Sequence, residues 1–329
     1  MNYQRIEKGR PIRLCFLGCG KICKAHAKNI VKSDNDLNLS FASRDSEKAR
    51  EFTSKFKGHR AFSSYDEAIA NDDIDVVMIT TPPDSHYELT LKALNAGKHV
   101  IVEKPPYFKS SDFDVLGSLA DEKKLQLLVA ENYFYKPLRI KIKELLESGI
   151  IGKAIFININ ATKKQKSKGD WRDDVKVSGH GALFEGGIHW VNFINNIGLN
   201  LQHSEGFVTD ASDPLERSIQ LSSNSEEGTI VNLFYSWEVD TIFKGLRLSK
   251  IFGSQGSITF ETNGIFVFTR GKKIKFCMPD LSNITGSHLM LNDFTTALRS
   301  GDDAGFHWKM AKKDLEIIEA VYQSIKNKI

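Results

Sequence analysis

Long hydrophobic runs are missing from this chain of 329 residues. No stretch reaches the roughly 18 consecutive apolar residues that a membrane-spanning helix needs. The opening residues, MNYQRIEKGRPIR, are polar and lack the apolar core of a secretory signal peptide. We therefore expect a cytoplasmic protein that does not associate with membranes.

Cysteine is scarce as well, and the sequence contains only Cys15, Cys19, Cys23 and Cys277. The first three are spaced by four residues, which invites comparison with a metal site. They are predicted to fall on a strand, a turn and the start of a helix, so their thiols would not converge on one ion. We expect no metal, and no disulfide in a reducing compartment.

Neither sign of charge is in large excess, because 45 Lys and Arg residues face 41 Asp and Glu residues, for a net charge of +4. The basic residues are spread along the chain and mixed with acidic ones, which argues against a nucleic-acid partner. The mild excess suits an anionic small molecule. A hydrophobic content of 41% is typical of a globular protein, and the length fits two domains.

Strand-like and helix-like segments alternate at least five times in the first 130 residues. The runs at 12–17 and 74–80 are continuously apolar, as expected for strands that are buried on both faces of a sheet. This rhythm predicts an α/β fold with a doubly wound parallel sheet of the Rossmann type. We assign residues 1–132 to this dinucleotide-binding domain.

The pattern changes after about residue 133, where closely spaced strands are joined by short turns. Such spacing predicts a second, α+β domain with a mainly antiparallel sheet over residues 133–329. The expected strands are 154–161, 205–209, 215–221, 229–237, 246–252, 257–260, 265–269 and 274–277, and the expected helices are 138–147, 183–197, 289–299 and 308–325.

A glycine-rich turn joins the first strand to the first helix: Gly18-Cys19-Gly20-Lys21-Ile22. Gly18 would permit a tight turn, and Gly20 would let the backbone approach a pyrophosphate at the start of the helix. The third position of the G-x-G-x-x-G fingerprint is Cys23, whose small side chain still permits close helix packing. In its strand-turn-helix context the motif predicts a dinucleotide site.

The residues after the second strand, Ser43-Arg44-Asp45, bear on the choice of cofactor. A hydroxyl and a guanidinium suit the 2′-phosphate of NADP, because arginine binds phosphate as a planar fork. Asp45 keeps NAD as the alternative, since an acidic residue there would bind the ribose hydroxyls. We favour NADP.

Four stretches of the sequence, including the glycine-rich turn, carry a family resemblance. They are Gly18 to Ile22 with His26 beyond, Thr81-Pro82-Pro83-Asp84-Ser85-His86, Ala96 to Pro105 with its Glu103-Lys104-Pro105 run, and Glu185-Gly186-Gly187-Ile188-His189. In these stretches the chain resembles the glucose–fructose oxidoreductase / inositol dehydrogenase / rhizopine-catabolism (Gfo/Idh/MocA) superfamily. The resemblance implies a Rossmann domain followed by a domain with a large, open sheet, and a homodimer or homotetramer that pairs through the outer face of that sheet.

Three residues are the catalytic candidates. Lys104 follows a predicted buried strand, and the resemblance implies that it touches both substrate and nicotinamide, where a cation would stabilise a developing alkoxide. His189 is the candidate acid or base, because histidine as a residue type suits proton transfer near neutral pH. Glu185 lies four residues earlier and would share a helix face with His189. The resembling family usually has aspartate there, so the longer Glu185 puts the standard chemistry in question.

The remaining candidates are weaker. The resemblance implies that Thr81 and Pro82 line the nicotinamide side of the site. Glu103 is a further cofactor-binding candidate, and His86 has either a cofactor-binding or a structural role. Asn132 and Tyr133 are expected near the ligand at the domain junction. Trp171 and Arg172 would form a substrate wall and a grip for a hydroxyl or a carboxylate.

These residues predict a dehydrogenase or reductase that acts on a sugar-like, polyol or cyclic diol substrate with NADP or NAD. Two alternatives remain open at this point. A non-catalytic regulator would keep the cofactor fold, and the glutamate at position 185 favours it. A lyase or glycosidase would use tightly held NAD for a transient oxidation, with Glu185 as an extra base.

Overall fold

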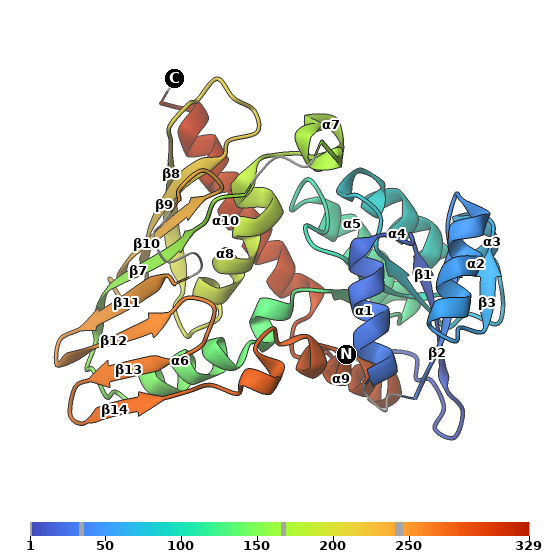
Figure 1. Ribbon diagram of the computed structural model, residues 1–329, viewed down its shortest axis with the longest axis horizontal. Helices are drawn as coiled ribbons and strands as arrows, with labels where there is room; N and C mark the ends of the chain where they lie inside the picture. The colour runs from blue at the N-terminus through green and yellow to red at the C-terminus, as the bar shows by residue number, and fades with distance from the viewer. Residues whose placement is uncertain (1, 33–35, 166–168, 241–245, 329) are drawn as a thin grey trace. The chain divides into compact units, whose positions relative to one another are not determined.

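The computed structural model describes residues 2–32, 36–165, 169–240 and 246–328. The chain divides into two compact units (Figure 1). The first comprises residues 1–131 and 288–312, and the second comprises residues 132–287 and 313–329. Each unit is described by itself below.

A six-stranded parallel sheet forms the centre of the first unit (Figure 1). Its order is β3-β2-β1-β4-β5-β6, so the strand order reverses between β1 and β4. The strands are β1 (Ile12–Leu17), β2 (Leu37–Ala42), β3 (Arg60–Phe62), β4 (Val76–Ile79), β5 (His99–Val102) and β6 (Leu127–Val129). Ligands of such sheets bind outside the carboxyl ends of the strands at the reversal point. The predicted doubly wound sheet is confirmed.

Helices connect these strands and cover the sheet. They are α1 (Lys21–Lys32), α2 (Ser46–Lys55), α3 (Tyr65–Ile69), α4 (His86–Asn95) and α5 (Asp112–Lys123). Every residue of β4 and β5 is buried, which explains why these strands read as unbroken apolar runs in the sequence.

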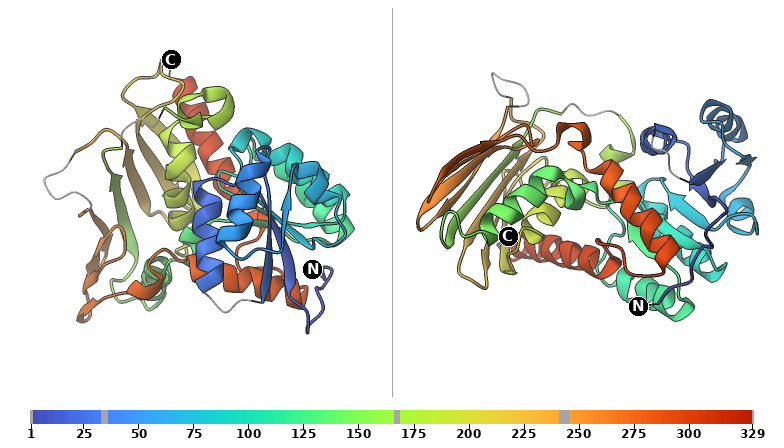
Figure 2. Two further views of the ribbon diagram at one scale, coloured as in Figure 1. Left: turned by 45° about the vertical axis from the view of Figure 1, so that its right-hand side comes forward. Right: turned by 90° about the horizontal axis from the view of Figure 1, so that it is seen from below.

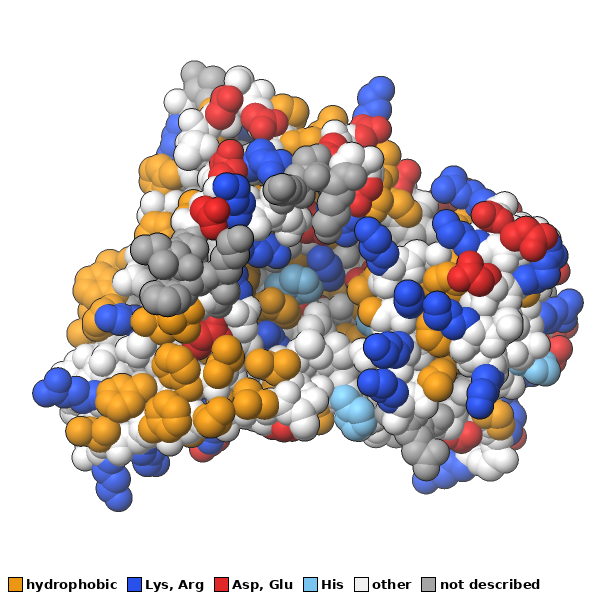
Figure 3. Space-filling model, in the orientation of Figure 1, with side chains coloured by type: hydrophobic (Ala, Val, Ile, Leu, Met, Phe, Trp, Pro, Cys, Tyr) orange, Lys and Arg blue, Asp and Glu red, His pale blue; other side chains and the backbone are white. Residues whose placement is uncertain are grey.

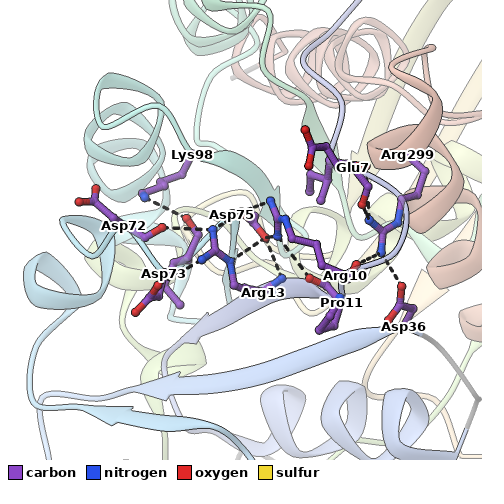
Figure 4. Close-up of polar contacts among 12 residues, drawn as sticks. Glu7, Arg10, Pro11, Arg13, Asp36, Asp72, Asp73, Asp75, Lys98 and Arg299 are labelled. Atoms are coloured by element: carbon purple, nitrogen blue, oxygen red, sulfur yellow. Dashed lines mark hydrogen bonds and ion pairs between the residues drawn. The ribbon is translucent and has the colours of Figure 1, made fainter.

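Asp75 ties the start of β1 to the start of β4 (Figure 4). Its carboxylate accepts hydrogen bonds from the guanidinium groups of Arg10 (2.6 Å) and Arg13 (2.8 Å), and from the backbone N–H of Arg13 (3.0 Å). Burial alone would raise the pKa of Asp75, but the hydrogen bonds from the two arginines hold it well below its usual range. The ionised carboxylate therefore helps to fix the register of two central strands.

A late segment of the chain returns to the first unit. It contains α9 (Ser287–Ser300) and the start of α10 (Trp308–Lys326). Arg299 donates to the backbone oxygens of Glu7 and Arg10, and the Trp308 ring stacks on Phe113 at 6.3 Å. The sequence-based division into 1–132 and 133–329 places residues 288–312 in the second domain, whereas the structure places them in the first unit. Helical periodicity does not reveal which sheet a helix packs against.

The second unit is built on an eight-stranded sheet (Figures 1 and 2). Its order is β14-β13-β12-β11-β7-β10-β9-β8, and every pairing is antiparallel except that of β7 with β10. The strands are β7 (Ala154–Thr162), β8 (Leu201–Val208), β9 (Ser218–Ser225), β10 (Ile230–Ser236), β11 (Leu248–Gly253), β12 (Gly256–Glu261), β13 (Val267–Arg270) and β14 (Ile274–Cys277). This confirms the predicted mainly antiparallel sheet.

The two faces of this sheet differ. Helices α6 (Pro137–Glu147) and α8 (Ile188–Asn195) cover one face (Figure 2). Side chains alternate between buried and more exposed along β7 and β10, as expected for a sheet with one covered face. None of the helices within the described ranges is long and apolar enough to cross a membrane.

Candidate functional site

The loop after β1 has the geometry of a phosphate-binding turn. Gly18 adopts a left-handed φ of 105°, and a Cβ there would lie 3.0 Å from Thr81 Cγ2. The Thr80 hydroxyl donates to the Gly18 carbonyl at 2.7 Å, which fixes the loop against the end of β4. A larger residue at position 18 would be strained by both the backbone angle and this contact.

The space over the loop is open. A Cβ at Gly20 would meet no atom of the described residues within 4 Å. Helix α1 begins at Lys21, and Cys23 in its first turn is fully buried against the sheet. Lys21 and Ile22 are both exposed. The N–H groups at a helix start favour anions, so these residues fit the pyrophosphate of a dinucleotide.

The residues after β2 take different roles. Asp45 caps α2, because its carboxylate accepts from the backbone N–H groups of Glu47 (3.1 Å) and Lys48 (3.3 Å). The Ser43 hydroxyl accepts from the Asp45 N–H at 3.1 Å. Arg44 is exposed, and its guanidinium contacts the Tyr65 hydroxyl. Arg44 is therefore an accessible cation at the position that selects between NAD and NADP, next to the exposed helix cap Asp45.

A buried carboxylate supports the backbone of Lys104 at the end of β5. Glu103 is hydrogen-bonded to His26 Nε2 of α1, and its second oxygen accepts from the Lys104 N–H at 3.1 Å. Burial would raise the pKa of Glu103, but the hydrogen bond and the positive charge available from His26 lower it. The Lys104-Pro105 peptide bond is cis.

His86 connects the loops after β4 and β5. Its ring nitrogens lie 2.9 Å from the Thr81 carbonyl oxygen and 3.0 Å from that of Pro105. The side chain is fully buried, and burial lowers its pKa. Thr81 and Pro82 are partly exposed between these groups and the phosphate loop. A direct cofactor contact from His86 stays a prediction, and its contacts favour a role in holding the two loops.

In the second unit, Glu185 lies on a single π-helical turn, Leu183–Gly187, which runs directly into α8. The sequence predicts one regular helix over 183–197, and the wider turn is a departure from it. The turn packs closely on Tyr235, because a Cβ at Gly186 would lie 2.2 Å from the Tyr235 hydroxyl. Such turns occur frequently at functional sites.

Glu185 is paired with Arg172. The Arg172 Nε donates to Glu185 Oε1 at 2.8 Å, and its Nη1 donates to Asp170 at 3.0 Å. The guanidinium lies 4.2 Å above the centroid of the Trp171 ring. Burial would lower the pKa of Arg172, but the two carboxylates raise it, so the arginine remains charged. The structure thus brings Glu185 together with Trp171 and Arg172, which the sequence suggests only as a separate pair.

His189 stacks on Tyr133. Their ring centroids are 4.4 Å apart with an interplanar angle of 14°, and Lys136 Nζ lies 4.4 Å from the centroid of the tyrosine ring. Asn132 Nδ2 donates to the Thr285 carbonyl in the same unit. The stacking restricts the His189 ring to one plane, which suits a group that must exchange a proton with a bound substrate.

Each unit therefore gathers its own part of the predicted site. The carboxyl end of the parallel sheet holds the phosphate loop, Ser43, Arg44, Thr81, Pro82, Glu103 and Lys104. The second unit holds Tyr133, Trp171, Arg172, Glu185 and His189. Sequence reasoning missed two acidic residues. Asp170 accepts a hydrogen bond from Arg172, and the Glu216 carboxylate accepts from the N–H groups of Gly181 and Leu183 at the start of the π-helical turn. Asp170 could have been found from its position directly before Trp171-Arg172, where an acidic residue can pair with the arginine. No local sequence pattern marks Glu216.

Comparison with protein families decides what this arrangement is. Residues 12–131 match the oxidoreductase family with an NAD-binding Rossmann fold, and residues 140–259 match the GFO/IDH/MocA C-terminal domain. The chain belongs to the GFO/IDH/MocA oxidoreductase family. The resemblance drawn from the sequence motifs is confirmed.

Two curated proteins with sugar-related names are similar to this chain. A dTDP-3,4-didehydro-2,6-dideoxy-alpha-D-glucose 3-reductase from Actinomadura kijaniata is 30% identical over 180 residues, which cover 54% of this chain and 54% of that protein. A D-xylose 1-dehydrogenase (NADP(+)) from Hypocrea jecorina is 29% identical over 202 residues, covering 58% of this chain and 51% of that protein. The matches span about half the length of these curated relatives.

The fold is shared over a greater length. A levoglucosan dehydrogenase solved with NADH and levoglucosan superposes with a TM-score of 0.87 at 18% sequence identity. The match covers 97% of this chain and 98% of that one. At this identity the likeness shows that the two chains share a fold.

Proposed function

We propose that this member of the GFO/IDH/MocA family is a dehydrogenase or reductase that moves a hydride between a nicotinamide cofactor and a CH–OH group of a sugar-like, polyol or cyclic diol substrate. The observation that carries the proposal is the charged and aromatic cluster of the second unit, in which Arg172 holds Glu185 and Tyr133 stacks on His189. Paired charges and stacked rings are suited to a ligand with many hydroxyls. The sugar-related names of the relatives support the same substrate class.

The cofactor supplies hydride chemistry when it is bound. In the oxidative direction the substrate loses a hydride from carbon and a proton from its hydroxyl oxygen. We assign the proton transfer to His189, and the stabilisation of the developing alkoxide to the Lys104 ammonium. Glu185, oriented by Arg172, would accept a hydrogen bond from a second substrate hydroxyl. Asn132 and Trp171 would line the substrate site.

We propose NADP as the preferred cofactor. Arg44 is exposed after β2, whereas Asp45 is engaged in capping α2 and is less available to ribose hydroxyls. Gly18, Gly20, Lys21 and Ile22 would hold the pyrophosphate at the start of α1. Thr81, Pro82 and Glu103 would border the nicotinamide.

A homodimer or homotetramer is also proposed, paired through the uncovered face of the eight-stranded sheet. Exposed apolar side chains follow one another across its strands, since Phe156 pairs with both Ile230 and Phe252, and Phe268 pairs with Phe276. Hydrophobic side chains gather over the end of the sheet that carries β13 and β14 in Figure 3. Apolar patches of this kind mark interaction surfaces. A reducing compartment such as the cytoplasm would suit the four free thiols.

The decisive test is turnover by the purified chain with a panel of aldoses, polyols and cyclic diols, followed by nicotinamide absorbance. Lys104→Met and His189→Asn should each lower kcat by at least about 100-fold, as expected for the loss of a group that acts in the transition state. Cofactor affinity should change little in His189→Asn.

Matched controls are Lys109→Met and His203→Asn, since both side chains are exposed and neither is placed in the site. Both controls should keep full turnover. Unchanged turnover in Lys104→Met and His189→Asn would overturn the assignment. A wild-type chain that binds cofactor but gives no hydride transfer with the panel, and that forms a stable complex with another protein, would favour the regulator instead.

A further inference from the structure

Glu216 is a buried carboxyl group beneath the segment that leads into the π-helical turn. It lies two residues before β9, and only 5% of its surface is exposed. Oε2 accepts a hydrogen bond from the Gly181 N–H at 3.1 Å, and Oε1 accepts one from the Leu183 N–H at 2.8 Å. The Ala182 N–H donates to the backbone oxygen of Glu216 at 2.7 Å. One residue therefore binds three consecutive N–H groups.

The attachment is close and leads directly to Glu185. A Cβ at Gly181 would lie 2.3 Å from both the backbone oxygen and Oε2 of Glu216, so only glycine fits there. The Gly181 carbonyl in turn accepts the Glu185 N–H at 3.0 Å. A short path of hydrogen bonds thus joins the Glu216 carboxylate to the backbone of the residue that pairs with Arg172.

Helix α10 contacts the Glu216 carboxylate through Tyr322. The Tyr322 hydroxyl donates to Glu216 Oε1 at 2.9 Å. The Tyr322 ring stacks on His180 at 4.4 Å with an interplanar angle of 19°, and His180 meets Phe184 edge-on at 5.5 Å. Glu216, His180 and Tyr322 border a cavity of about 270 Å³. Its other charged lining groups are Asp210, Asp213 and Lys326.

The pKa of the Glu216 carboxyl group lies near neutral pH. Burial raises the pKa of Glu216 to about 7, although the hydrogen bonds from Leu183, Tyr322 and Gly181 act in the opposite direction. The charged form accepts at both oxygens. A protonated carboxyl has one oxygen that carries hydrogen, and that oxygen is a poorer acceptor for a backbone N–H. Protonation therefore weakens the attachment of the segment.

We propose that Glu216 is a positioning residue whose carboxylate fixes the start of the π-helical turn, and with it the place of Glu185 beside Arg172. The inference rests on the proposed function, because Glu185 is taken as a residue of the substrate site. Glu216 does not itself touch substrate. Its effect reaches the chemistry through Gly181 and Leu183.

Glu216→Gln tests the inference with little change of shape. Its amide oxygen can still accept from Leu183, but its NH2 group faces the Gly181 N–H and cannot accept from it. We expect kcat to fall about tenfold at pH 8, the effect of losing roughly one hydrogen bond to a charged group. Cofactor affinity should not change, since the cofactor residues lie in the other unit. Glu205→Gln, an exposed residue of β8, is the matched control and should keep full activity.

The pH dependence separates positioning from a merely structural effect. The ratio of wild-type to Glu216→Gln kcat should approach one below about pH 6 and rise toward pH 8, because wild-type Glu216 loses its proton near pH 7. Ionisations that the two proteins share cancel in the ratio. A ratio that does not vary with pH would overturn the inference.

Amide hydrogen exchange supplies a readout that does not depend on activity. Glu216→Gln should speed exchange in the peptide that spans residues 181–187 and leave β11 and β12 unchanged. Unchanged exchange in that peptide, or equal acceleration throughout the second unit, would overturn the inference. Faster exchange confined to 181–187 in a chain that turns over no substrate would support the attachment and overturn the proposed function instead.

Discussion

Arg44 follows β2 and remains exposed, while the acidic residue beside it caps a helix. Arg44→Ala should weaken NADPH binding by about 10- to 100-fold, because one charge-assisted partner of the 2′-phosphate is lost. NADH binding should change by less than about threefold. Titration of each cofactor, followed by energy transfer from tryptophan to nicotinamide, measures both affinities.

Arg50→Ala is the control for Arg44, since Arg50 is an exposed arginine of α2 that pairs with Glu47. It should affect neither cofactor. Equal loss of NADPH and NADH affinity in Arg44→Ala would contradict a role in phosphate selection. Tighter binding of NADH than of NADPH by the wild-type chain would assign NAD as the cofactor.

Individual site residues differ in how readily sequence predicts them. Gly18 and Gly20 belong to a local motif, and so does Lys104, because contiguous residues encode each loop. The pairing of Arg172 with Glu185 spans 13 positions and depends on how two segments fold back on one another. Glu216 lies 33 positions from its partner Leu183 and belongs to no motif, so only the folded chain reveals it.

At the scale of single elements, β5 begins with a histidine that must stay neutral. His99 Nδ1 accepts a hydrogen bond from the Gln126 N–H at 3.0 Å, and burial lowers its pKa to about 4. A histidine that is harder to protonate in the folded chain favours folding above its unfolded pKa of about 6.5, and this contribution is lost as the pH falls toward 4. The strand pairing of β5 and β6 should therefore weaken in acid.

Comparison with His99→Asn isolates this effect, since the asparagine oxygen can accept from Gln126 but does not titrate in this range. The free energy of unfolding of the wild type, relative to the variant, should fall by about 2–3 kcal/mol between pH 7 and pH 4. Urea denaturation at each pH measures it. The exposed His203→Asn control should show no such change, and a pH-independent difference for His99→Asn would refute the prediction.

Element types follow well from sequence where periodicity is strong. The bounds of β1 are predicted to the residue, those of the amphipathic α10 within one residue and those of β4 within two. The π-helical turn at Leu183–Gly187 is not, because its hydrophobic pattern is that of an ordinary helix. Tyr235 of β10 lies so close to this turn that Gly186 has no room for a Cβ, and that contact exists only in the folded unit.

At the scale of the whole molecule, the uncovered sheet face predicts the oligomeric state. Phe156→Asp combined with Phe252→Asp places two charges on cross-strand partners in the apolar face. The wild-type chain should behave as a dimer or tetramer in size-exclusion chromatography with light scattering, and the variant should approach the 37.0 kDa of one chain.

The control for this surface is Val115→Asp, which alters an exposed apolar residue of α5 outside the sheet. It should leave the oligomer intact. A wild-type chain that is monomeric at micromolar concentration would contradict the proposed interface. Dissociation by both substitutions would indicate general destabilisation instead.

The core of the first unit includes residues 288–312, which are synthesised long after residues 1–131. The unit therefore cannot complete its fold when its own sheet has just been synthesised. Trp308 fills the space beside Gly117, where a Cβ would lie 2.7 Å from its ring. A ribosome-bound chain that has emerged only as far as residue 287 contains all six strands of the parallel sheet but lacks this part of its core. The nucleotide-binding half can therefore begin to fold during translation but cannot complete its core until residues 288–312 have emerged.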